Sequence, residues 1–146
     1  ISMKIAIGAD HAGYSAKKEA ICFLEENGYS VTDVGAFSEE SVDYPDIALK
    51  VADMVASHKD DRGILFCGTG IGVSITANKT PGIRAALCSS IELAKLSRRH
   101  NDANILAIGA RFHTVKEMIS IIKVWLETPF DGGRHTNRIN KIEKLT

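Results

Sequence analysis

Short apolar runs alternate with segments of helical periodicity along the whole chain. Runs with strand character lie at residues 4–9, 29–34, 63–66, 83–88 and 104–108. Amphipathic helical segments lie at residues 15–27, 44–57, about 73–79, 90–99 and 115–127, with a last one from about residue 134. Strands that alternate with helices favour one parallel sheet with helices on both faces. The sequence therefore predicts a single α/β domain over residues 1–146, a three-layer Rossmann-like or flavodoxin-like sandwich with a five-stranded parallel sheet.

The composition is that of an ordinary globular protein of this length. Of the 146 residues, 45% are hydrophobic and 25% are charged, and the formal net charge is zero. A neutral balance gives no reason to expect nucleic acid or an anionic membrane as a partner. No apolar stretch approaches the roughly 18 residues that span a bilayer. We therefore expect a small-molecule partner.

The cysteines and the N-terminus indicate a cytoplasmic protein. Cys22, Cys67 and Cys88 are odd in number and form no CxxC pair, which argues against a disulfide framework or structural zinc and for a reducing compartment. Strand-like residues begin at once, so we expect no signal peptide. We interpret Ile1-Ser2, ahead of Met3, as residues left by cloning.

The glycine-rich run Cys67-Gly68-Thr69-Gly70-Ile71-Gly72 directly follows the apolar run at 63–66. Glycines let backbone N–H groups approach a bound anion closely. A helix that starts here would direct its positive end at the same ligand. A thiol in that field loses its proton more easily than a free one, so Cys67 is a candidate base or nucleophile. Cys22 and Cys88, in contrast, are expected in the core.

Other polar residues lie close to strand ends. Ligands of such sheets bind beyond the carboxyl ends of the strands. Asp10-His11 follows the first strand, Arg111 follows the fifth, and Arg98-Arg99-His100-Asn101 directly precedes the fifth. We expect these groups to converge with Cys67 on one rim of the sheet. Arg134 and Arg138 share one face of the last helix, which is either a solvated face or a phosphate site.

Other sites fit the sequence less well. The loop is spaced G-x-G-x-G, the first turn lacks the dinucleotide fingerprint, and no P-loop is present. A metal site at Asp10, His11 and His100 is possible, but no ligand spacing supports it.

Several short motifs occur together in a fixed order. They are Gly8-Ala9-Asp10-His11-Ala12-Gly13, Asp43-Tyr44-Pro45, Cys67-Gly68-Thr69-Gly70-Ile71-Gly72, Ala77-Asn78-Lys79, Gly82-Ile83-Arg84-Ala85, Ser97-Arg98-Arg99-His100-Asn101-Asp102-Ala103-Asn104, Gly109-Ala110-Arg111 and Gly132-Gly133-Arg134-His135. Through these motifs the chain resembles the type B ribose-5-phosphate isomerases, in the family that also includes galactose-6-phosphate isomerase subunits.

The resemblance implies an aldose–ketose isomerase that works through an enediolate. It makes Cys67 the base, gives Thr69 hydrogen bonds to the reacting oxygens, and gives His100 the opening of the sugar ring. The substrate-binding residues that it implies are Asp10, His11, Tyr44, Gly68, Gly70, Ile71, Gly72, Asn101, Arg111, Arg134 and Arg138. Of these, His11 and the three arginines would gather the phosphate. One branch of the family uses a glutamate base where this chain has Val73, which places the chain in the cysteine branch.

The resemblance also implies how the protein operates. It implies no cofactor and no metal, a role in the pentose phosphate pathway, and a homodimer or homotetramer with active sites shared between subunits. Two alternatives stay open. One is an allose- or galactose-6-phosphate isomerase of the same family, and the other is a non-catalytic phosphosugar-binding module.

Overall fold

The computed structural model describes residues 2–146, so that Ile1, interpreted above as a cloning remnant, lies outside the described residues. Five parallel strands form one sheet in the order β2-β1-β3-β5-β4. The strands are β1 (Lys4–Ala9), β2 (Ser30–Gly35), β3 (Arg62–Cys67), β4 (Ala85–Leu87) and β5 (Ile105–Gly109). The predicted five-stranded parallel sheet is confirmed. Its order differs from the flavodoxin order only because β4 takes the edge and β5 the inner place.

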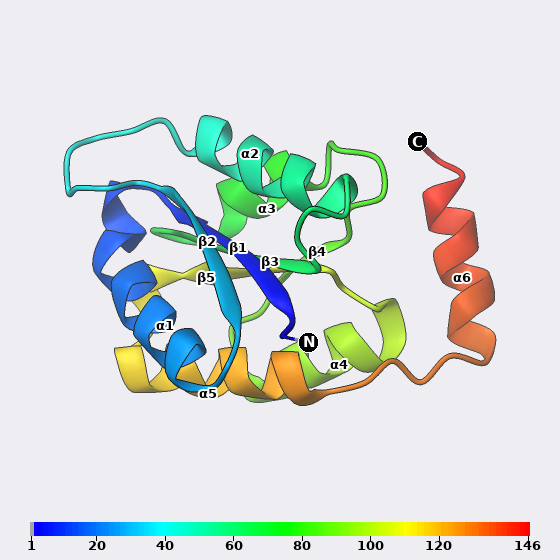
Figure 1. Cartoon of the computed structure of the whole chain (residues 1–146). Helices are drawn as coiled ribbons and strands as arrows, with labels where there is room; N and C mark the ends of the chain where they lie inside the picture. The colour runs from blue at the N-terminus through cyan, green and yellow to red at the C-terminus, as the bar shows by residue number, and fades with distance from the viewer. Residues whose placement is uncertain (1) are drawn as a thin grey trace.

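Helices cover both faces of this sheet (Figure 1). One layer holds α2 (Tyr44–Ala56) and α3 (Ile71–Ala77), and the other holds α1 (Tyr14–Glu26), α4 (Ile91–Asn101) and α5 (Val115–Glu127). Two short 3-10 turns, η1 (His11–Gly13) and η2 (Ala110–Phe112), follow β1 and β5. The last helix, α6 (Arg134–Glu143), stands beside the sandwich (Figure 1). Within residues 2–146, no helix combines the length and the apolar character needed to cross a membrane.

Two elements, α3 and β4, begin two residues away from the start that the sequence predicts. The helix α3 begins at Ile71, inside the glycine run, because Gly70 adopts φ +79° and lets the chain turn into the helix immediately. The strand β4 begins only at Ala85 because the backbone N–H of Arg84 donates to the side chain of Asn104 rather than to a neighbouring strand.

The core consists of two apolar layers separated by the sheet. Successive side chains of a strand point to opposite faces. Ile64 and Phe66 of β3 therefore pack toward α1 and α5, and Leu65 and Cys67 pack toward α2 and α3. The alternation directs the Cys67 thiol to the α2–α3 side of the sheet.

The other two cysteines have different outcomes. Cys88 is 1% exposed, as expected, but the expectation of a core position for Cys22 is wrong. The residues Ala16, Ala20 and Leu24 form the buried face of α1. Cys22 lies two positions after Ala20, a rotation of about 200° around the helix, which turns it to solvent.

The connections after the strands open a crevice at the carboxyl edge. The chain leaves β1 and β5 toward α1 and α5 on one face, whereas it leaves β3 toward α3 on the other face. Neighbouring strands whose connections diverge leave room for a ligand at that point of the sheet. The end of β3 has such a neighbour on each side, because it lies between β1 and β5.

Candidate active site

Cys67 ends β3 at the floor of this crevice. Its side chain is 5% exposed, and its Sγ accepts a hydrogen bond of 3.1 Å from the backbone N–H of Gly70. The Thr69 hydroxyl accepts from the N–H of Ile71, also at 3.1 Å. A Cβ at Gly70 would lie 2.8 Å from the backbone nitrogen of Gly109, so only glycine allows the loop to approach β5 this closely. The loop thus places a thiol, a hydroxyl and backbone amides side by side.

A cavity of about 390 Å³ opens above the thiol. Its lining consists of Asp10, Tyr44, Cys67, Gly68, Thr69, Ile71, Gly72, Ile75 and Arg111. All of these except Ile75 are site residues expected from the sequence. Ile75 lies one helical turn after Ile71 and therefore on the same face of the helix, so the sequence spacing could have predicted it as a lining residue. Gly70 shapes the loop from a buried position behind the lining.

Asp10 and Tyr44 reach the cavity from β1 and α2. Asp10 is 7% exposed, its N–H donates to the carbonyl of Phe66, and its Oδ1 accepts from Gly13 at 3.1 Å. The Tyr44 ring lies against Gly72, where a Cβ would come within 2.5 Å of two ring carbons. Both side chains are therefore held by the backbone around the thiol.

A basic side chain stands on each side of the loop, Arg111 after β5 and His11 after β1. The backbone N–H of Arg111 donates to the carbonyl of Gly68 at 3.1 Å, and its guanidinium lies over that glycine, with Nη1 2.8 Å from where a Cβ would stand. His11, in η1, accepts at Nδ1 from the N–H of Val42 at 3.5 Å. A neutral His11 with Nδ1 as acceptor carries its proton on Nε2, which remains a donor.

The remaining expected residues lie elsewhere, and the expectation that all of them share one rim is wrong. His100 and Asn101 end α4, and a helix that precedes a parallel strand ends at the amino edge of the sheet. Arg134 and Arg138 lie on α6 near the same edge. Four residue steps of β3, from Gly63 to Cys67, separate the two edges by about 13 Å. Within one chain, His100 therefore does not reach the cavity at Cys67.

This second group brings two imidazole rings and a carboxylate close together. The His100 and His135 rings stack with centroids 4.4 Å apart and planes inclined by 15°. Donor atoms of His100, Asp131 and His135 lie within 4.8 Å of one another. Asp10 and His11, which the sequence offered as metal ligands together with His100, lie instead at the carboxyl edge, near Cys67.

The geometry of this cluster disfavours a metal ion. A nitrogen ligand holds a metal in the plane of its ring, and one ion cannot lie in two nearly parallel planes. Removal from water, and then charge interactions with His100, Arg134 and Arg138, lower the pKa of His135 below its usual value, and only Asp131 acts in the opposite direction. Such a concentration of positive charge favours an anion.

A buried thiol beside backbone amides, with the Arg111 guanidinium in the same cavity at the carboxyl edge of a parallel sheet, is typical of an α/β enzyme for small anionic substrates. Residues 5–142 match the family described as Ribose/Galactose Isomerase. The chain belongs to this family, and the resemblance found in the sequence is confirmed.

Individual relatives agree over nearly the full length. Ribose-5-phosphate isomerase B of Escherichia coli (strain K12) is 48% identical over 142 residues, which cover 97% of this chain and 95% of the relative. The solved structure of Clostridium thermocellum ribose-5-phosphate isomerase B is 53% identical, covers 98% of this chain and 97% of that chain, and superimposes with a TM-score of 0.97. The enzyme of Mycoplasma genitalium, solved with bound ribulose-5-phosphate, is 42% identical and covers 99% of this chain and 97% of its own, with a TM-score of 0.95.

Proposed function

We propose that the protein interconverts ribose 5-phosphate and ribulose 5-phosphate. The observation that carries the proposal is the cavity in which the Cys67 thiol, the Thr69 hydroxyl and the loop amides lie together. The named activity of the relatives supplies the substrate. We propose a role in the pentose phosphate pathway of the cytoplasm on the same ground.

Isomerisation needs a base and a site for developing negative charge. In the proposed mechanism the Cys67 thiolate takes the proton from C2 of the open-chain aldose, and the electron pair of that C–H bond forms the C1–C2 double bond. The charge that develops on O1 is stabilised by backbone N–H groups of the loop, as in other anion holes. The thiol then returns its proton to C1, and the hydroxyl proton of O2 is transferred to O1. The two steps balance without an oxidant or a reductant.

The site is completed, in this proposal, by a second copy of the chain. His100, Asn101, Arg134 and Arg138 lie too far from Cys67 to act on the same substrate within one chain. Exposed apolar side chains lie at and after the strand ends of the carboxyl edge, and two of them, Ile71 and Ile75, line the cavity. They are Ile71, Ile75, Leu87, Ile91, Leu93 and Phe112. A patch of this kind is typical of a protein interface, and we infer a homodimer, alone or within a tetramer, in which each site takes these four residues from the partner subunit.

A steady-state assay with ribose 5-phosphate, allose 6-phosphate and galactose 6-phosphate tests the substrate. We expect the highest kcat/KM for ribose 5-phosphate. Cys67→Ser should lower kcat by about 100-fold or more while leaving the fold intact, since loss of a general base typically costs that much. Turnover near the wild-type value in this variant would show that Cys67 is not the base. A higher kcat/KM for one of the hexose phosphates would show that ribose 5-phosphate is not the preferred substrate.

Complementation tests the shared site. Cys67→Ser and His100→Asn, each poorly active alone, are co-expressed with different affinity tags. In a mixed dimer one site combines a wild-type Cys67 with a wild-type His100, so random pairing should restore about a quarter of the wild-type sites. Doubly purified mixed dimers that are no more active than either parent would show that both residues act from the same chain.

A further inference from the structure

The helix α6 is attached to the body of the protein at both of its ends. Just before α6, the Asp131 N–H donates to the Arg99 carbonyl at 3.0 Å, and its carboxylate accepts from the Arg99 Nε at 3.1 Å. At the other end, the Glu143 carboxylate pairs with the Arg84 guanidinium at 2.5 Å. Both attachments lead to the last turn of α4, which carries His100.

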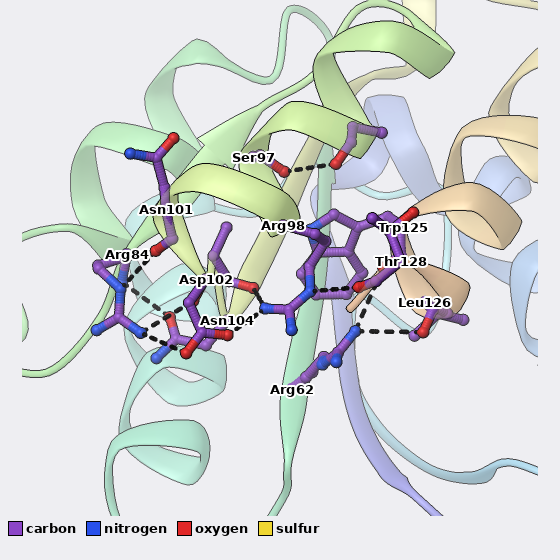
Figure 2. Close-up of polar contacts among 12 residues, drawn as sticks. Arg62, Arg84, Ser97, Arg98, Asn101, Asp102, Asn104, Trp125, Leu126 and Thr128 are labelled. Carbon is purple, nitrogen blue, oxygen red and sulfur yellow. Dashed lines mark hydrogen bonds and ion pairs between the residues drawn. The ribbon is translucent and has the colours of Figure 1, made fainter. Parts of the chain in front are cut away.

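Arg84 links Glu143 to that turn directly. Its Nε donates to the carbonyl of Asn101 and its Nη2 to the carbonyl of Asp102, both at 2.9 Å (Figure 2). Carbonyls at the end of a helix have no partner within the helix, so the guanidinium satisfies groups that need a donor. The third arm of the same planar group holds Glu143. Because the guanidinium is rigid, α6 and the end of α4 are fixed relative to each other.

The end of α4 is itself immobilised from the opposite side. Arg98, which is 5% exposed, donates from Nη1 to Asp102 Oδ1 and to the Ala103 carbonyl, each at 2.7 Å (Figure 2). The side-chain amide of Asn101 points away from Arg84 (Figure 2). The last turn of α4 is therefore fixed by hydrogen bonds from both Arg84 and Arg98. The Asn101 side-chain amide takes no part in these bonds.

Few further contacts fix the direction of α6. Ile139 is its one buried residue among those described. Gly132 and Gly133, directly before the helix, adopt φ angles of +69° and +58°. Such glycines allow the backbone to pivot at low cost. The contact between Asp131 and Arg99 lies before this pivot. Beyond it, α6 is held at its start by the stacking of His135 on His100, in its middle by Ile139 and at its end by Glu143.

We propose that Glu143, through Arg84, is a positioning residue that sets the distance from Arg134 and Arg138 to His100. The inference rests on the proposed function, in which these arginines hold the phosphate and His100 acts on the sugar ring. The ion pair between Glu143 and Arg84 then determines how far the phosphate lies from the reacting end of the substrate. Substrate binding depends on that spacing, whereas proton transfer at Cys67 does not.

The test compares Glu143→Gln with the matched control Glu127→Gln on α5, an exposed glutamate without an ion pair in residues 2–146. In Glu143→Gln we expect KM for ribose 5-phosphate and the inhibition constant of inorganic phosphate to rise together, by roughly fivefold, with kcat within about twofold, because a partly exposed pair of this kind contributes little more. The control should match the wild type. Thermal stability should be the same in all three proteins.

Three outcomes would overturn the proposal. One is unchanged phosphate inhibition and KM in Glu143→Gln, and another is an equal change in the control. The third is a joint loss of kcat and thermal stability without weaker phosphate binding, which a purely structural role would give. Calorimetric titration with inorganic phosphate separates this proposal from the proposed function, because it reports on α6 even if the protein does not turn over ribose 5-phosphate.

Discussion

Replacement of Lys17 by methionine should reveal how much the fold depends on one buried cation. Lys17 lies on the buried face of α1 and is 1% exposed. Its Nζ donates to Asp33 Oδ1 and to the carbonyl of Ala36, each at 2.6 Å, and lies 5.2 Å from the centre of the Phe37 ring. The ammonium thus joins α1 to the end of β2 and to the loop that leads to Tyr44.

The expected loss of stability follows from what the substitution leaves behind. Methionine replaces the aliphatic part of Lys17 but leaves the Ala36 carbonyl without a donor in a site that is 4% exposed. An unsatisfied buried carbonyl costs about 1–3 kcal/mol. Breaking a fully buried ion pair costs roughly 3–5 kcal/mol. Asp33 is 35% exposed and regains water, so we place the total near the lower limit, about 3 kcal/mol.

Urea denaturation at neutral pH measures this loss, with Lys18→Met as the control. Lys18 is the exposed neighbour on the same helix, so its substitution should change stability by less than about 0.5 kcal/mol. The thermal midpoint of Lys17→Met should fall by roughly 6–12 °C, at about 2–4 °C per kcal/mol for a chain of this size. Equal stabilities of the two variants would show that the buried ammonium contributes nothing and would refute the reasoning.

Three further predictions concern separate parts of the molecule. Gly72→Ala should displace the Tyr44 ring, because a Cβ would come within 2.5 Å of it, and should raise KM about threefold to tenfold if one hydrogen bond to the sugar is lost; an unchanged KM would contradict this. Burial raises the pKa of the Cys88 thiol to about 11, so the unfolded thiol ionises first and stability falls between about pH 9 and about pH 11, by up to roughly 2–3 kcal/mol. Cys88→Ala should lack this loss in urea denaturation across that range, and an identical pH dependence in both proteins would argue against it. Thr114 caps α5 in a reciprocal pair with Glu117, so Thr114→Ala should lower stability by about 1 kcal/mol in the same assay; no measurable loss would mean that the cap is dispensable.

The sequence alone predicted the sheet, most helix boundaries and the loop at Cys67, because these features depend on local patterns. Periods of two and 3.6 residues report which face of an element is buried. Gly70 and Gly72 are informative in a similar way, because a residue without a Cβ indicates that another part of the chain packs closely against it, even when the sequence does not show which part. Cys22 confirms this rule, because the period of Ala16, Ala20 and Leu24 turns it to solvent, and the core expectation for it relied on its apolar neighbours in sequence instead.

The tertiary structure decided which residues meet. The order of helix and strand already places His100 at the amino edge, opposite Cys67, but its neighbours there, Asp131 and His135, depend on where α6 packs. Lys17 reads as an ordinary helical lysine, and only the docking of α1 against β2 brings it to Asp33 and Ala36. Arg84 finds its carboxylate partner at Glu143, 59 residues away. Contacts of this kind depend on strand order and on the faces that the connections take, and no local period of the chain encodes either.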